Sequence, residues 1–386
     1  MPLNSTIYIV FLAVTSLFYW GLSQKWRLPA LALFGFIFYA YYSVLYVLLL
    51  LLLAALTYCI GAWIQRGEKR QGLVLGVGIL VLILAYFKYA DAFGHVLGEY
   101  AGRPFRLASV VLPLGISFYS FEFIHYLIEV YRGNIRDSDW RTFWAFVFFF
   151  PTRASGPIKR YPDFAKQVED LRFKPEHLFY GIGLIVLGFV QKIIIADSLV
   201  SATQVLVNPS SLHGAFDALG RLYFYSIRIY GDFMGLTNIA MGSGLLFGIL
   251  VPRNFNYPYL RPNIALFWNN WHMSLSNWVR DYLYIPFGGS RKGPVRTALN
   301  LLMAMLIVGL WHGSTLNFAV WGLYHGVGLM VHRIWRGIFG KFIPNNVFTY
   351  ALGVLITFHF VTIGWAFFVT GSFTDSVSLL RLLLHV

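Results

Sequence analysis

Charged residues are scarce in this chain of 386 residues. Only 12% of the residues are charged, while 58% are apolar and 19% are aromatic, whereas a soluble domain carries about 25% charged residues. So few charged side chains exclude an ordinary soluble domain, and the many aromatic residues exclude intrinsic disorder. Together with a mean hydropathy of +0.64, the composition indicates a membrane protein.

Acidic residues are especially few, with 16 Asp and Glu against 30 Lys and Arg, so the formal net charge is +14. Nucleic-acid binding needs a solvated basic face, which this sequence has too little polar surface to build, and we expect no nucleic-acid partner. Basic loops on the cytoplasmic side of a membrane explain the excess instead. The clusters Lys25 with Arg27, and Arg66 with Lys69 and Arg70, therefore predict an outside N-terminus.

Cysteine is nearly absent. The single residue, Cys59, cannot form an internal disulfide. Because it lies in an apolar run, we expect it to be a small buried hydrophobic residue. Lipid attachment and a reactive thiol are the alternatives.

Charge-free runs locate the membrane, since a spanning helix needs about 20 mostly apolar residues. We predict on the order of ten transmembrane or re-entrant helices in one membrane domain over 1–386, with N-terminal helices in 1–105 and a core in 106–370. The run 28–65 is long enough for two passes, with a turn at Tyr41-Tyr42-Ser43. The charge-free runs are 1–24, 28–65, 71–87, 233–252, 297–332 and 342–374.

Polar groups at membrane depth are functional candidates because they are costly there. The first is His312, in the middle of the charge-free run 297–332. A neutral imidazole can act as a general base, and Gly309 and Gly313 on either side allow a helix break or a close approach to a substrate. The alternative is a structural histidine that bonds to a neighbouring helix.

A second candidate is the segment 262–290. If it is helical, Asn269, His272, Ser276 and Arg280 form one polar stripe, beside an aromatic stripe that contains Trp271 and Trp278. Such a stripe could line an aqueous channel. The alternative is an amphipathic helix at the membrane interface.

A third candidate is the basic segment 151–160, in which two prolines and a glycine argue against a continuous helix. Arg153, Lys159 and Arg160 could bind a phosphate-bearing donor, or the segment is an ordinary basic loop. Lys192 and Asp197 are interpreted as a structural pair, although five residues is a poor spacing on one helix face.

The remaining histidines give a weak signal. His325 and His332 are seven residues apart and could share a helix face. They have no carboxylate or thiol near them in the sequence, which makes them a poor case for metal binding. We therefore predict no metal site.

Four motifs, Asn254-Phe-Asn-Tyr-Pro-Tyr-Leu260, Phe267-Trp-Asn-Asn-Trp-His272, Trp278-Val-Arg-Asp-Tyr-Leu-Tyr-Ile-Pro-Phe-Gly-Gly289 and Gly309-Leu-Trp-His-Gly313, resemble a known family. This is the membrane-bound O-acyltransferase (MBOAT) family. The likeness is to its bacterial branch, which holds the alginate O-acetylation and teichoic-acid D-alanylation membrane proteins. It runs from about residue 110 to about residue 370.

The resemblance implies an all-α polytopic fold around a central reaction chamber, with His312 as the catalytic residue and His272 as a second functional position. Asn269 and Arg280 would bind substrate or donor near His272, and the basic segment would recognise the donor. The donor would be a cytoplasmic thioester, acetyl-CoA or an acyl carrier protein, with no tightly bound cofactor. The acceptor would be a hydroxyl of an extracytoplasmic cell-envelope polysaccharide or a partner acyltransferase, at a bacterial plasma (inner) membrane.

Residues 284–289, Tyr-Ile-Pro-Phe-Gly-Gly, favour acetyl transfer. The chain departs from alginate-type members at Asp232–Asn238 and at Val369. It also ends at Val386, and its length is closer to that of the D-alanylation type. D-alanyl transfer to a teichoic-acid-like polymer is thus the alternative. Another class, a transporter or proton relay, would also suit histidines at membrane depth, and an inactive scaffold is a third possibility.

Overall fold

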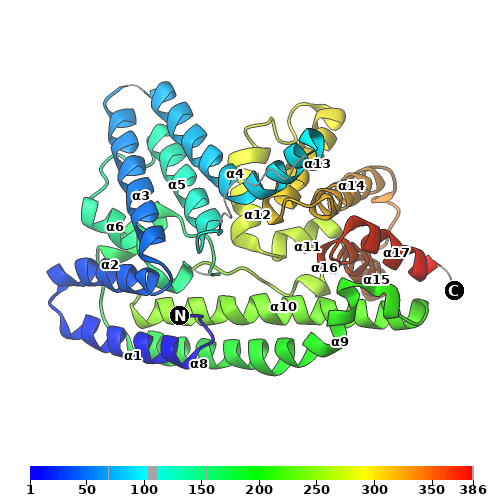
Figure 1. Cartoon of the computed structure of the whole chain (residues 1–386), viewed down its shortest axis with the longest axis horizontal. Coiled ribbons are helices and arrows are strands. Elements are labelled where there is room, and N and C mark those ends of the chain that lie inside the picture. The colour runs from blue at the N-terminus through cyan, green and yellow to red at the C-terminus, as the bar shows by residue number, and fades with distance from the viewer. Residues whose placement is uncertain (68, 103–110, 154, 385–386) are drawn as a thin grey trace. The chain divides into compact units, whose positions relative to one another are not determined.

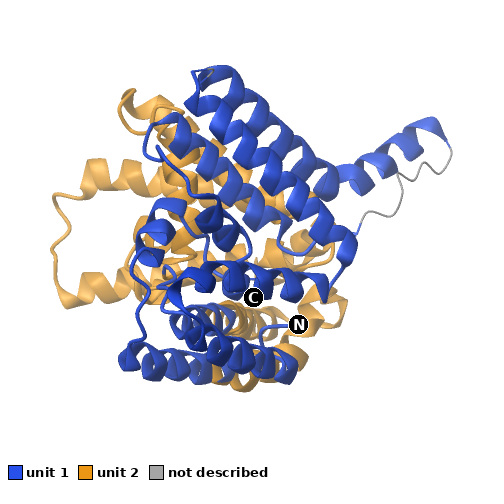
Figure 2. Cartoon of the chain, turned by 90° about the vertical axis from the view of Figure 1, so that its left-hand side faces the viewer, with its two compact units in different colours: residues 1–189, 235–252 blue, residues 190–234, 253–386 orange. Residues whose placement is uncertain are grey.

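The computed structural model describes residues 1–67, 69–102, 111–153 and 155–384. This part of the chain folds into helices and loops without a strand. It forms two compact units, one of residues 1–189 and 235–252, the other of residues 190–234 and 253–386 (Figure 2). The predicted boundary between residues 105 and 106 lies outside the described residues, and the single-domain organisation stays a prediction.

The first unit contains eight α-helices and the C-terminal part of α10, drawn from blue to green in Figure 1. A short 3₁₀ helix, η1, precedes α7. The elements are α1 (Thr6–Gly21), α2 (Gln24–Ala40), α3 (Val44–Gln65), α4 (Lys69–Ala101), α5 (Ile116–Tyr131), α6 (Trp140–Val147), η1 (Phe150–Thr152), α7 (Tyr161–Val168), α8 (Pro175–Phe189) and α10 (Ala215–Leu246).

The second unit contains the N-terminal part of α10 and most of the C-terminal half of the chain. Two of its elements, η2 and η7, are π-helical. The elements are η2 (Val190–Ala196), η3 (Asp197–Leu199), α9 (Val200–Gln204), η4 (Val205–Val207), η5 (Pro209–Ser211), η6 (Pro258–Leu260), α11 (Ile264–Asn270), α12 (Met273–Val279), η7 (Arg280–Tyr284), α13 (Gly293–His312), α14 (Leu316–Phe339), α15 (Val347–Gly364), α16 (Ala366–Val369) and α17 (Phe373–Leu384).

The predicted all-α membrane fold is confirmed. Five helical segments of the described chain are long and apolar enough to cross a membrane, and α1 is apolar but shorter. The predicted turn is also confirmed, because α2 ends at Ala40 and α3 begins at Val44, where Ser43 caps the new helix by accepting a hydrogen bond from the Tyr46 N–H. The five segments are Val44–Gln65, Lys69–Ala101, Pro175–Val207, Gly293–His312 and Val347–Val369.

Cys59 is exposed on α3, so the prediction that it is buried is wrong. Leu45, Leu48 and Leu52 on the same helix are also more than half exposed. A spanning helix can present apolar side chains to lipid, which is as apolar as the protein interior. Apolarity therefore did not indicate burial at this position.

Glycines let α8 approach the C-terminal part of α10 within the first unit. A Cβ atom at Gly188 would overlap the carbonyl oxygen of Gly235, and one at Gly242 would overlap the carbonyl oxygen of Gly181. Small residues at helix interfaces allow the close backbone packing that drives association in lipid. This contact therefore depends on the absence of side chains.

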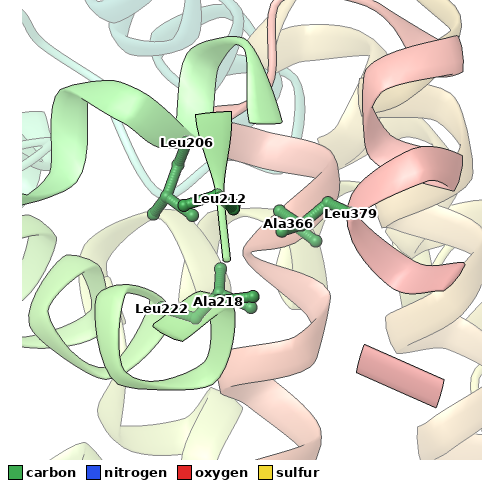
Figure 3. Packing of buried hydrophobic residues seen from close by; sticks show 6 residues of the cluster. All are labelled: Leu206, Leu212, Ala218, Leu222, Ala366 and Leu379. Carbon is green, nitrogen blue, oxygen red and sulfur yellow. The ribbon is translucent and has the colours of Figure 1, made fainter. Parts of the chain in front are cut away.

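In the second unit, an apolar cluster joins α10, α16 and α17 to the short helices that precede α10. Figure 3 shows its side chains directed toward one another, and all of them are at most 9% exposed. The residues are Leu206, Leu212, Ala218, Leu222, Ala366 and Leu379. The cluster anchors α16, which carries part of the site described next.

Candidate functional site

The helices α13 and α14 lie side by side as a tight hairpin in the second unit (Figure 1). Glycine makes this approach possible, since a Cβ atom at Gly309 would overlap the Phe318 carbonyl oxygen and one at Gly322 would overlap that of Met305. α13 ends at His312, and Gly313 continues in extended backbone with φ −173°. Of the two glycines that allow a helix break, Gly309 lies inside α13 and Gly313 follows its end, so His312 stands at the C-terminal end of the helix.

Aromatic rings surround the His312 imidazole. The ring centroid of Trp321 lies 5.2 Å away with the planes at 89°, that of Phe368 lies 5.0 Å away, and that of Phe318 lies 6.2 Å away in a stacked arrangement. His312 nevertheless remains partly exposed. The ring is therefore confined in orientation, although the residue is not fully buried.

His272 occupies a break between α11 and α12. Its backbone has φ +44°, a left-handed conformation that side-chain-bearing residues rarely adopt. Asn254 holds the break, because its carbonyl oxygen accepts the Met273 N–H at 2.8 Å and its Oδ1 accepts the Ser274 hydroxyl at 2.6 Å. The His272 side chain is 3% exposed, and its Nε2 has no hydrogen-bond partner among the described residues.

The predicted helical polar stripe over 262–290 is wrong because this break divides it. Asn269 lies exposed near the end of α11, while the adjacent Asn270 is buried and donates to the Leu266 carbonyl oxygen at 2.7 Å. Arg280 is 57% exposed and pairs with Asp281 at 2.8 Å. The turn at His272 changes the direction of the chain, so regular helical spacing does not carry across it.

Trp311 connects the two motif histidines. Its ring centroid lies 4.5 Å from that of His312 and 6.1 Å from that of His272, which Phe233 contacts at 4.6 Å on an edge. Sequence reasoning missed Phe233 and Trp321. Phe233 lies in the segment Asp232–Asn238, where the chain departs from alginate-type members, and this departure was a signal that pointed to it. Nothing in the sequence distinguished Trp321 from a core residue.

The basic segment lies in the first unit, around Glu122. This carboxylate pairs with Arg153 at 3.1 Å and with Lys159 at 2.7 Å, and the three side chains are at most 4% exposed. Arg160 is half-buried. After η1 the described residues of the segment are not helical until Tyr161, which confirms the predicted break. Sequence reasoning missed Glu122, although an acidic residue in the apolar stretch 116–131 was a usable signal.

Lys192 pairs with two carboxylates in the second unit, Asp197 and Asp232, the latter at 2.8 Å. The residues from Val190 to Ala196 are π-helical, and a π-helix bonds residues five apart. This explains how Lys192 reaches Asp197 across a spacing that suits an α-helix poorly. The predicted structural pair is therefore present.

Among the described residues, no group of three or more His, Cys, Asp or Glu side chains is arranged to hold a metal ion. Indole and phenyl rings contact both motif histidines.

The helical fold and the two motif histidines define a multi-pass membrane protein with a histidine-containing site. The family described as "MBOAT, membrane-bound O-acyltransferase family" matches residues 34–372. The chain belongs to this family and is therefore a membrane-bound O-acyltransferase. The transporter and scaffold alternatives give way to this assignment.

Several curated proteins are similar over most of this chain. A probable alginate O-acetylase AlgI from Pseudomonas aeruginosa is 35% identical over 382 residues, which cover 95% of this chain and 72% of that protein. A peptidoglycan O-acetyltransferase from Helicobacter pylori is 31% identical, with 91% and 72% covered. A teichoic acid D-alanyltransferase from Bacillus subtilis is 34% identical over 273 residues, with 66% and 68% covered.

Proposed function

We propose that this enzyme transfers an acetyl group from a cytoplasmic thioester to a hydroxyl of an extracytoplasmic cell-envelope polysaccharide, or to a partner acyltransferase that passes it on. The membrane would then be the bacterial plasma (inner) membrane. Similarity to the O-acetylating relatives supports acetyl transfer, because it covers 95% and 91% of the chain, against 66% for the D-alanyltransferase.

In the proposed reaction, His312 accepts the proton of the acceptor hydroxyl as its oxygen attacks the thioester carbonyl carbon. The new C–O bond forms, the C–S bond breaks, and the proton passes from His312 to the thiolate that leaves. The partial exposure of His312 suits contact with a reactant. His272 would orient the donor or polarise its carbonyl, for which its Nε2, unpaired among the described residues, offers a polar atom at a buried position.

The observation that carries this proposal is the contact of one indole ring, that of Trp311, with both histidines. A rigid ring between two imidazoles fixes their separation, and a fixed geometry is what general acid–base catalysis requires. The neighbouring aromatic rings would also limit the access of bulk water, which protects a thioester from hydrolysis.

Donor recognition is the second part of the proposal. Because Glu122 engages Arg153 and Lys159 in the protein interior, these two residues would shape the basic segment rather than touch the donor. Arg160, which is half-buried, would be the member that meets donor phosphates. Arg280 and Asn269, both exposed, would bind substrate at the surface of the second unit.

The test is an acyl-transfer assay with purified protein in liposomes, labelled acetyl-CoA or acetylated carrier protein as donor, and a cell-envelope polysaccharide as acceptor. We expect transfer by the wild type and a loss of about 10²-fold or more in His312→Ala, the usual contribution of a general base. His213→Ala, which changes an exposed histidine in the same unit, should keep full activity. Transfer by a folded His312→Ala at the wild-type rate overturns the assignment of the base.

Assays with different thioester donors distinguish acetyl transfer from D-alanyl transfer. Transfer of D-alanyl from a carrier-protein thioester, with no transfer of acetyl from either donor, overturns the acetyl assignment and leaves the role of His312 intact. Mass spectrometry of envelope polysaccharides from cells with and without the protein would then identify the acceptor.

A further inference from the structure

Three successive turns of α14 each bury a side chain with a nitrogen or oxygen atom on the same face. Asn317, Trp321 and His325 are spaced four residues apart, which places them in line along the helix, and they are 2%, 1% and 0% exposed. Trp268 of α11 lies against this line, with its ring centroid 5.1 Å from that of His325 and 5.7 Å from that of Trp321. We refer to these four residues as the α14 polar face.

Each member of the α14 polar face has a polar atom without a hydrogen-bond partner among the described residues. These atoms are the Asn317 Oδ1, the indole N–H groups of Trp268 and Trp321, and both ring nitrogens of His325. Asn317 does use its Nδ2, which donates to the Thr370 carbonyl oxygen and hydroxyl at 3.3 and 3.2 Å. The face thus offers donors and acceptors together.

Burying these polar atoms lowers the stability of the folded protein unless each atom forms a hydrogen bond. Buried polar groups in proteins are almost always paired, and where no protein group serves, an ordered water with two to four polar partners does so. Water both donates and accepts, which matches the mixture of two indole N–H groups, an amide oxygen and an imidazole. An apolar ligand would leave all of these atoms unpaired.

The α14 polar face also touches the catalytic histidine proposed above. Trp321, its middle member, presents its ring at 89° to His312 with the centroids 5.2 Å apart. Trp365 stacks on Trp321, with the ring centroids 5.9 Å apart and the planes at 21°. Because these contacts restrict the His312 ring, whatever fixes Trp321 also fixes the direction of the His312 nitrogens.

We propose that the α14 polar face binds ordered water, and that His325 is a positioning residue that acts on His312 through this water and Trp321. The role of His325 rests on the proposed function of His312. In this arrangement His325 touches neither donor nor acceptor, and it sets the geometry of the base rather than taking part in proton transfer.

The decisive variant is His325→Phe. If the position were ordinary core, removing two unpaired nitrogens and keeping a ring would raise stability and leave activity unchanged. We instead expect the thermal unfolding midpoint to stay level or rise while kcat falls about 10-fold or more, with the KM for the thioester donor unchanged. His325→Gln, which keeps a donor and an acceptor, should recover part of kcat.

His332→Phe is the matched control, since it makes the same change two turns further along α14 at a half-buried position; its kcat should equal that of the wild type. A His325→Phe enzyme with wild-type kcat overturns the proposal, even where His312→Ala is inactive. A second measurement does not depend on any variant. A cryo-electron microscopy map of the wild type that resolves water should show density bonded to His325, and a dry His325 at that resolution overturns the proposal.

Discussion

The Trp311 indole lies 6.1 Å from the His272 imidazole, centroid to centroid, and joins two motifs that are separate in the sequence. His272 is held at a left-handed turn between two short helices, and Trp311 belongs to the last turn of the long helix α13. Because Trp311 also contacts His312, a change at this one ring should alter the position of both histidines.

Replacing Trp311 should therefore affect catalysis more than folding. We expect Trp311→Leu to lower kcat about 10- to 100-fold, because a displacement of about 1 Å in a catalytic group can cost that much. Trp311→Phe, which keeps an aromatic ring, should lose less. Transfer rates measured beside thermal unfolding midpoints would check this, and equal kcat values for the wild type and the Leu variant would contradict it.

His272 allows backbone strain to be separated from chemistry. Its φ of +44° costs a residue with a Cβ atom about 1–2 kcal/mol that glycine does not lose. We expect His272→Gly to unfold at a higher temperature than His272→Ala, while both transfer acyl groups far more slowly than the wild type. Equal stability of the two variants would show that the turn is unstrained, and full activity would remove His272 from the site.

The α13–α14 hairpin should not tolerate a side chain at Gly322. In Gly322→Ala the added methyl group would meet the Met305 carbonyl oxygen. Overpacking of this kind lowers the free energy of unfolding by about 1–3 kcal/mol. Gly337 on the same helix is a matched control, because nothing lies within 4 Å of its Cβ position. Gly337→Ala should leave stability unchanged or raise it by about 0.5–1 kcal/mol, as thermal unfolding of the two variants would show.

Glu122 should be essential for the fold of the first unit. Glu122→Gln leaves Arg153 and Lys159 buried without a counter-ion, and breaking a buried ion pair costs about 3–5 kcal/mol. Asp170→Asn removes a carboxylate from an exposed pair with Arg172 and should change stability little. A Glu122→Gln protein as stable as the wild type would mean that the two cations find other partners.

The composition and the short sequence motifs were enough to predict the protein class, one turn and the family. The scarcity of charge indicated a membrane protein, the charge-free runs gave the turn at Tyr41–Ser43, and the histidine motifs gave the family. Gly313 marked the end of α13 because glycine and the polar residues after it do not continue an apolar helix.

Only the tertiary structure decided which polar residues meet. The stripe predicted over 262–290 assumed regular helical spacing, and one left-handed residue, His272, ended that regularity because Asn254 holds the turn from outside the helix. Glu122 pairs with two cations that are more than 30 residues away in the sequence, and Cys59 is exposed. The residues next to Glu122 and Cys59 in the sequence predict neither the ion pairs nor the exposure. Sequence determines what each segment prefers, whereas burial, ion pairing and ring contacts depend on which segments the folded chain brings together.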